Sequence, residues 1–423
     1  MDKEHEFAQY LNREGFHRFN QAWIEKYQKL GYLGGSIRLN NLTNIEKECL
    51  RGLLGLDLSN GYLNLTYTRL KKAIDQTYFE YVDFLKTLEY LNGHKIMTNK
   101  EIKVCYENKF QLFKESLLNQ YKNSPAFKWL DHYFQTDKMI KKYYNDDLKY
   151  YRDTLNNICH ALNQLPIYHN EYQLLAIFAQ NITKDPHYFD EDFIRELLVK
   201  GIVEVLEISN TSYNEILYEA GILKDDLSNY CQVCHIKPLK SSSYDYFYNQ
   251  YEPLNLNLYN LHSITELFLS SQILVIENPS IFRELMSFIK EQHLNIGIVC
   301  SNGQINLCTY QLLDRLVESG CMLYYCGDFD PEGLLIADKL KSRYKSHLEL
   351  WQYTKYNFDK AKTSHVNISQ RRLTLLQNIQ NPILKEIALI VEKESSFAYQ
   401  EGLVQVYKFE IKKLLKKSGK QNE

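Results

Sequence analysis

The stretch Gly327-Asp-Phe-Asp-Pro-Glu-Gly333 decides the fold class, because it directly follows a short apolar run, Met322-Leu-Tyr-Tyr-Cys326. Apolar runs of this length between turn residues are typical of strands buried in a parallel sheet. A helix is predicted to begin near Leu334, and Asp330 is well placed to act as its N-terminal cap. A strand, an acidic turn and a helix in this order predict one repeat of an α/β domain.

Two earlier segments have the same order of strand and helix. The apolar run Gln272-Ile-Leu-Val-Ile276 ends at Glu277, and the helix predicted after it starts at Pro279. A second run, Ile296-Gly-Ile-Val-Cys300, closes in a turn and leads to another helix. This alternation predicts a C-terminal α/β domain with a parallel sheet over residues 262–423.

Three carboxylates, Glu277, Asp328 and Asp330, lie directly after predicted strands. Ligands of open α/β sheets bind at the carboxyl ends of the strands. The 51 positions from Glu277 to Asp328 leave room for two strand–helix units, so the first and third strands are predicted to bring the acids together. Their mutual repulsion favours a divalent cation, and hard oxygen ligands suit Mg²⁺ or Mn²⁺. Such an ion can activate water against a phosphodiester.

This pattern indicates a metal site only when all of its parts occur together. A single Asp-x-Asp pair is common in surface loops, and a helix cap explains Asp330 equally well. A strand followed by Glu, together with a strand followed by Gly-Asp-x-Asp-Pro-x-Gly, is much rarer by chance. We therefore predict a metal site at Glu277, Asp328 and Asp330 that acts on phosphates.

The first 261 residues are predicted to be mostly helical. Residues 1–95 have a strand–helix–strand–helix order that fits a small winged-helix-like module or an ordinary packing module. The capping box Thr43-Asn-Ile-Glu46 marks one of these helix starts. Residues 96–237 have apolar side chains at every third or fourth position, as helices do. Residues 238–261 are interpreted as a linker and an entry strand.

The composition limits the location and the partners. The chain of 423 residues is too long for one core, and its formal net charge of −2 does not announce nucleic-acid binding. It has no apolar run of about 18 residues that could span a membrane. Nine Cys without a signal peptide predict a reducing cytoplasm. The 34 Tyr are ascribed to coding bias rather than to base stacking.

The arrangement of the acids resembles the Toprim domain, which topoisomerases, bacterial primases and several nucleases share. Gly327-Asp-Phe-Asp-Pro-Glu-Gly333 is most similar to the stretch in the topoisomerase VI A subunit and its meiotic relatives. In those proteins a D-x-D-P-x-G stretch and a Glu after the first strand supply metal ligands. The resemblance implies the same roles for Asp328, Asp330 and Glu277, within a Toprim-like fold.

A closer resemblance covers most of the chain, and it is to the JetD-type subunit of type II Wadjet systems. It rests on four stretches: Leu42-Thr-Asn-Ile-Glu-Lys-Glu-Cys-Leu-Arg-Gly-Leu-Leu-Gly55, Asp225-Asp-Leu-Ser228, Val275-Ile-Glu-Asn-Pro279 and Cys300-Ser-Asn-Gly-Gln304. It implies a metal-dependent endonuclease that hydrolyses closed-circular plasmid DNA in antiplasmid defence. The implied partners are double-stranded DNA, an SMC-like ATPase with its accessory subunits, and a second copy of the chain.

Glu401 is a possible additional ligand, because Gln400-Glu401 resembles a Gln/Glu stretch late in related JetD proteins. A solvated helix face explains Glu401 as well. The chain also departs from that family, which usually has Trp-Pro-Gly or similar after the second Asp, where this sequence has Pro331-Glu-Gly333. This departure puts no ligand in doubt.

Two other functions are compatible with the same residues. A topoisomerase-like break-former would need a nucleophilic Tyr, and no motif singles one out among the 34. A degenerate Toprim domain would serve only as a DNA clamp or assembly module. The intact set of acids argues against that second alternative.

Overall fold

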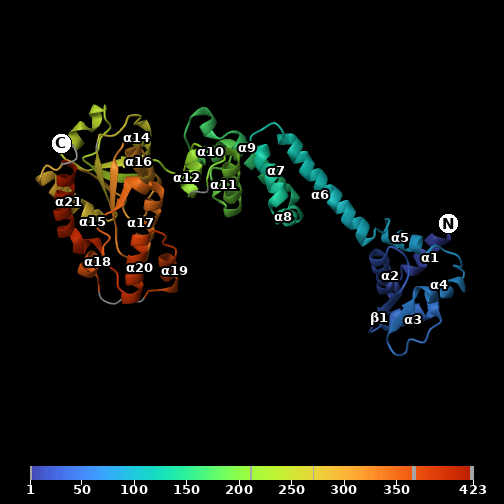
Figure 1. Cartoon of the computed structure of the whole chain (residues 1–423). Helices are drawn as coiled ribbons and strands as arrows, with labels where there is room; N and C mark the ends of the chain where they lie inside the picture. Colours follow the sequence, from blue (N-terminus) through green and yellow to red (C-terminus); the bar gives the residue numbers. More distant parts are fainter. Residues whose placement is uncertain (1, 210–211, 270, 364–367, 420–423) are drawn as a thin grey trace. The chain divides into compact units, whose positions relative to one another are not determined.

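The computed structural model describes residues 2–209, 212–269, 271–363 and 368–419 (Figure 1). Its contacts divide the chain into two compact units, Met1–Leu155 and Asn156–Glu423. The described residues are mostly helical, and a six-stranded, largely parallel sheet lies in the second unit, so the predicted fold class is confirmed. Within the described part of the chain, no helix is long and apolar enough to cross a membrane.

The first unit is helical apart from one pair of strands. Its elements are α1 (Lys3–Leu11), α2 (His17–Leu30), β1 (Ser36–Leu39), α3 (Asn44–Leu54), β2 (Leu63–Thr66), α4 (Tyr67–Asp75), α5 (Phe84–Asn92), α6 (Asn99–Tyr121), α7 (Ala126–Thr136) and α8 (Ile140–Asp146), and α9 (Leu148–Asn163) runs across the division.

The strand–helix–strand–helix order predicted near the N-terminus is confirmed by β1, α3, β2 and α4. The predicted capping box starts α3: the Thr43 hydroxyl oxygen accepts from the Glu46 backbone N–H (3.2 Å), and the Glu46 carboxylate accepts from the Thr43 N–H (2.8 Å). The helix ends at Gly55, whose φ of 63° is accessible to glycine at little cost. β1 and β2 pair antiparallel. The winged-helix-like interpretation stays a prediction.

The second unit carries helices, short strands and the main sheet. Its elements after α9 are β3 (Gln173–Leu174), α10 (Leu175–Thr183), α11 (Asp192–Leu206), α12 (Tyr213–Glu219), β4 (Ile222–Leu223), β5 (Tyr230–Cys234), α13 (Asp245–Asn249), β6 (Leu254–Asn257), α14 (Leu258–Ser263), β7 (Gln272–Ile276), α15 (Pro279–Glu291), β8 (Gly297–Cys300), α16 (Leu307–Glu318), β9 (Met322–Cys326), α17 (Pro331–Tyr344), β10 (Leu348–Leu350), α18 (Lys355–Ala361), α19 (Gln370–Gln377), α20 (Pro382–Glu394) and α21 (Val404–Gly419).

The main sheet has the strand order β10-β9-β7-β8-β5-β6. The first four strands run parallel, whereas β5 is antiparallel to both β8 and β6. Two of the six strands, β5 and β6, lie before residue 262, so the sheet begins earlier in the chain than the predicted domain. The predicted domain boundaries themselves stay predictions, and the division at residue 155 falls inside the predicted middle region.

Helices cover both faces of this sheet, which explains why its strands are almost continuously apolar. All five residues of β7 and all four of β8 are buried. In Figure 1, α15 and α21 lie on one side of the sheet, and α16 and α17 lie on the other. A strand buried on both faces has no solvent side and therefore shows no alternation of polar and apolar residues.

The connections that leave the parallel strands β7 and β9 run in opposite directions across the sheet. From β7 the chain passes through α15 to β8 on one side, whereas from β9 it passes through α17 to β10 on the other side. Adjacent parallel strands whose connections leave in opposite directions open a crevice at their carboxyl ends. The fold therefore predicts a ligand site at the ends of β7 and β9.

Candidate metal centre

Glu277 and Asp328 lie side by side at the carboxyl ends of β7 and β9. The two strands are paired up to Ile276 and Cys326, so the residues that follow them are neighbours. The Asp328 backbone N–H donates to Glu277 Oε2 (3.2 Å). The structure thus brings together two of the predicted acids, from positions 51 residues apart.

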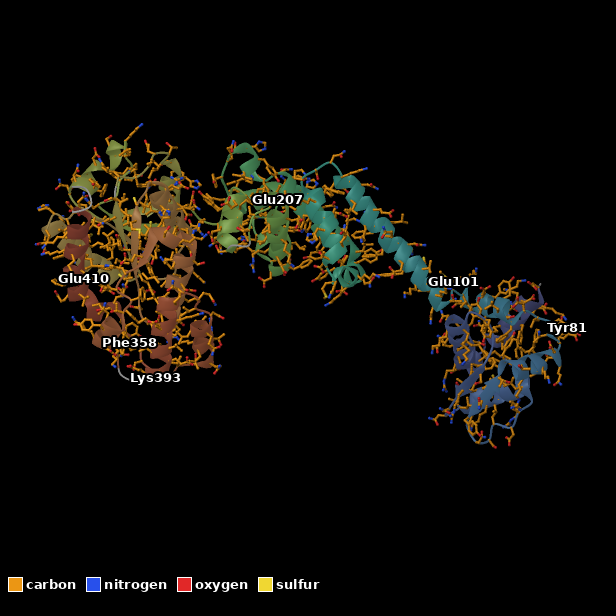
Figure 2. The ribbon with its side chains drawn as sticks, viewed as in Figure 1. Tyr81, Glu101, Glu207, Phe358, Lys393 and Glu410 are labelled. Carbon is orange, nitrogen blue, oxygen red and sulfur yellow. The ribbon has the colours of Figure 1, made fainter. Side chains whose placement is uncertain are left out.

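Phe329 sets the direction of the acidic turn. It is buried, and its ring centre lies 5.1 Å from that of Tyr353 and 6.2 Å from that of Phe358. Phe358 belongs to α18 (Figure 2). The Phe329 N–H also donates to the Ala398 carbonyl (2.8 Å). Since neighbouring side chains in extended backbone point to opposite faces, an inward Phe329 directs the acids on either side of it away from the core.

Gly327 leaves room for the Glu277 carboxylate. A Cβ at this position would collide with Glu277 Oε2 and would lie 2.9 Å from the Tyr325 hydroxyl and 3.0 Å from the Tyr353 hydroxyl. The Tyr325 hydroxyl donates to the same Glu277 oxygen (3.4 Å). The glycine is therefore required by space rather than by backbone conformation.

Gly327→Ala is expected to lower the free energy of unfolding by about 1–3 kcal/mol, because an added methyl group must displace a half-buried carboxylate or two buried rings. Urea denaturation of the full chain measures this loss. Gly52→Ala in α3 is the control, because its Cβ would meet only the Tyr10 hydroxyl, at 3.9 Å. Equal stability of the two variants would show that the side chains around Gly327 move aside at little cost in free energy.

Gln400 ties the ends of both strands to the C-terminal segment, although the sequence pointed to it only as the neighbour of Glu401. It is fully buried. Its backbone N–H donates to Asp328 Oδ1 (2.9 Å), and its side-chain oxygen accepts from the Asn278 N–H (3.2 Å). Its side-chain nitrogen donates to Cys326 Sγ (3.4 Å). A buried amide with all these contacts fixes the orientation of Asp328.

Glu401 lies at the rim of the same site. Its side chain is exposed, and its Oε1 accepts from the Asn278 side-chain amide (2.7 Å). It is close enough that its charge helps to raise the pKa of Asp328. The structure therefore places Glu401 beside the acids, held by Asn278, and its role as a ligand stays a prediction.

Asp330 serves as the N-terminal cap of α17, as its position before Pro331 indicated. Its Oδ1 accepts from the Gly333 N–H (2.8 Å). Its Oδ2 is paired with Arg372 of α19 at 2.7 Å, and Arg372 also binds Glu332 through Nε (2.9 Å). Both Asp330 oxygens are thus engaged, and one of them is held by a positive charge.

The acids carry more negative charge than the site neutralises. Burial and the charge of Asp328 raise the pKa of Glu277 to about 7. Burial raises the pKa of Asp328 to about 6, with contributions from the charges of Asp330 and Glu401. Burial also raises the pKa of Asp330, against the effect of Arg372. Raised pKa values in a cluster of acids mark a place that favours a bound cation.

The donor set fits Mg²⁺ as a partial ligand shell. Among the described residues, no three His, Cys, Asp or Glu side chains converge closely enough to hold a metal ion by themselves. Mg²⁺ is usually bound by one or two carboxylates and completes its shell with water and phosphate oxygens. The adjacent pair of Glu277 and Asp328 matches that requirement, whereas Asp330 would first have to leave Arg372.

Four residues that local sequence patterns did not assign to the site complete it in the structure, namely Asn278, Tyr325, Arg372 and Gln400. Asn278 directly follows Glu277, which was a weak signal in the sequence. Arg372 and Gln400 lie 40 or more positions from the acids that they contact, so no local pattern could give them these roles.

Comparisons with known proteins match both halves of the chain to family models. Residues 33–238 match the model "Protein of unknown function N-terminus" (DUF3323), and residues 254–409 match "Protein of unknown function C-terminus" (DUF2399). A comparison with curated proteins found no match. All the acids of the site lie within residues 254–409. The N-terminal and C-terminal parts of the chain are thus similar to two different families of unknown function, and the part that matches the DUF2399 model carries the acidic site.

Proposed function

We propose that this chain is the metal-dependent DNA endonuclease subunit of an SMC-type antiplasmid complex, with a Toprim-like C-terminal domain. The observation that carries the proposal is the pair of Glu277 and Asp328, half-buried and adjacent at the ends of β7 and β9. A site of this kind suits a cation and the phosphate that it binds. The partners and the plasmid substrate rest on the resemblance to the JetD-type subunit.

The residues of the site have separate tasks in this proposal. Glu277 and Asp328 would hold Mg²⁺ or Mn²⁺, with Asp330 and Glu401 close by. Such an ion supplies positive charge for the phosphate oxygens and a more acidic water. Tyr325 and the Asp328 N–H orient the Glu277 carboxylate, and the Gln400 N–H orients the Asp328 carboxylate.

A homodimer gives the reaction a simple geometry, because two copies of one acidic site can cut the two strands of a duplex. The near-neutral charge of the chain offers little non-specific attraction to DNA. The chain alone is therefore expected to cut slowly, and its partner complex is expected to deliver the DNA.

The direct test is plasmid cutting by the chain together with its SMC-like ATPase and accessory subunits. We expect Mg²⁺-dependent conversion of supercoiled plasmid to linear DNA, complete loss of cutting in excess chelator, and little cutting by the chain alone. A reconstituted complex that hydrolyses ATP on plasmid but leaves the DNA intact would refute the nuclease and favour the clamp.

A covalent break-former has a candidate nucleophile in Tyr399. Its side chain is 39% exposed, and the charges of Asp330 and Asp328 are near enough to raise its pKa further, after the effect of burial. The same assay separates the two mechanisms. Hydrolysis leaves free DNA ends, whereas a tyrosyl intermediate leaves protein attached to the ends after denaturation, and Tyr399→Phe would then abolish cutting.

A further inference from the structure

We propose that Arg372 competes with the divalent cation for Asp330 and, once displaced, binds the phosphate of the DNA substrate. This inference rests on the proposed function and adds a substrate-binding residue to it. Arg372 belongs to α19, outside the strand ends that carry the acids.

The contacts of Arg372 hold a long, flexible side chain in a fixed position. Its guanidinium binds Asp330 Oδ2 (2.7 Å) and Glu332, and its central carbon lies 4.4 Å from the centre of the Phe397 ring. The side chain is 28% exposed. A planar guanidinium that stacks on a ring and pairs with two carboxylates is held at the edge of the site, yet it still faces solvent.

Asp330 is the point of competition. Its Oδ1 accepts from the Gly333 N–H and caps α17, so Oδ2 is the oxygen that a cation can take with the least disturbance of the cap. Arg372 occupies that oxygen. A cation that takes Oδ2 must therefore break the ion pair with Arg372, and removal of Arg372 must make Asp330 a better ligand.

The charges of the site favour this exchange. The guanidinium of Arg372 pairs with two carboxylates of an acidic group that comprises, among the described residues, Glu277, Asp328, Asp330, Glu332 and Glu401. A divalent ion neutralises more of this charge than Arg372 does. After the ion binds, the attraction between Arg372 and the acids falls, because the carboxylates are already compensated.

A released Arg372 has the chemistry to bind phosphate. Its fork of N–H groups matches two phosphate oxygens, as it matched two carboxylates. Phe397 keeps the guanidinium near the site, so it can bind the same DNA backbone whose phosphate the cation holds. The exchange would couple metal binding to DNA binding, because the bound cation would release Arg372 and the released guanidinium would bind the phosphate.

The test uses Arg372→Ala, Arg372→Lys and the control Arg371→Ala, which changes the neighbouring, exposed arginine of α19. Mn²⁺ affinity is measured by titration calorimetry on the full chain without DNA, and plasmid cutting is measured with the complete complex at saturating Mn²⁺. Thermal unfolding of each variant reports whether α19 stays folded.

We expect Arg372→Ala to bind Mn²⁺ about 3- to 10-fold more tightly, in line with the strength of a partly exposed ion pair. We expect it to cut plasmid at least about 10-fold more slowly, because a charged contact to the phosphate is lost. Arg372→Lys keeps the charge, so its Mn²⁺ affinity should stay near that of wild type, while its cutting falls because the fork is lost. Arg371→Ala should change neither quantity.

A purely structural tether between α19 and α17 predicts a different result. Its loss would lower the unfolding temperature and weaken or leave unchanged the Mn²⁺ affinity, and this outcome overturns the inference. A slower Arg372→Ala enzyme without tighter Mn²⁺ binding also overturns it. If the wild-type chain binds no Mn²⁺, the proposed function itself fails, which is distinct from a wild-type chain that binds Mn²⁺ with no effect of Arg372.

Discussion

Asp328→Asn is expected to slow Mg²⁺-dependent plasmid cutting by the complete complex by about 100-fold or more, the scale seen when an essential charge contact in a site is removed. The exchange keeps the size of the side chain and an oxygen that can accept from the Gln400 N–H. It removes the negative charge that lies beside Glu277. The fold should therefore persist while the cation loses a ligand of the right charge.

The pH of the assay matters for this prediction. The pKa of Asp328 is raised to about 6 by burial, with help from the charges of Asp330 and Glu401. Cutting is therefore best measured near pH ~8, well above that pKa, where the wild-type carboxylate is ionised and the comparison with a neutral amide is complete. Mn²⁺ titration of the same proteins shows whether the loss arises from metal binding.

Asp359→Asn is the matched control, because it makes the same exchange on the exposed side of α18. Its cutting rate should equal that of wild type. Equal rates for Asp328→Asn and wild type would show that the acidic pair takes no part in the reaction, and the proposed nuclease site would have to be abandoned.

Glu277→Gln is expected to stabilise the metal-free protein by about 3 kcal/mol near pH ~8, because the pKa of Glu277 is raised from 4.5 to about 7 and one pKa unit corresponds to about 1.4 kcal/mol. Burial, then the charge of Asp328, raises the pKa of Glu277 from its ordinary value of 4.5 to about 7. The folded chain therefore prefers the protonated acid. Glutamine is neutral at every pH and keeps an oxygen for the Asp328 N–H and the Tyr325 hydroxyl.

The sign of the pH dependence follows from this shift. Below about pH 4.5 the side chain is protonated in both the folded and the unfolded states, so wild type and the Glu277→Gln variant should differ little in stability. As the pH rises from about 4.5 to about 7, the unfolded chain loses the proton while the folded chain keeps it, so the wild-type chain loses stability relative to the variant, and the difference is complete above about 7. Urea denaturation in chelator, near pH ~4.5 and near pH ~8, measures both ends of this range.

Glu386→Gln, on the exposed side of α20, is the control and should show no such difference between the two pH values. Added Mg²⁺ should reverse the order at the higher pH, since a cation stabilises the folded state that binds it. A Glu277→Gln variant that is less stable than wild type at the higher pH in chelator would contradict the electrostatic account.

Local patterns in the sequence were enough to predict the elements of the acidic domain. Apolar runs correctly predicted β7 and β9 to the residue, and the cap before Pro331 is confirmed at Asp330. These features depend on burial, on helix capping and on the fixed geometry of proline, and neighbouring residues are enough to express them. The inclusion of β5 and β6 in the sheet was missed, because strand pairing across a long connection leaves no local pattern.

The sequence by itself therefore determined the α/β class, the strand ends and the identity of the acids that follow them. Only the tertiary structure decided which acids are free to act. It places Glu277 beside Asp328 at the carboxyl ends of β7 and β9, and it pairs Asp330 with Arg372. The physical reason is that the position of an acid directly after a strand depends on neighbouring residues. The side chain that balances its charge lies far away in the sequence and is brought into contact only by the packing of the helices.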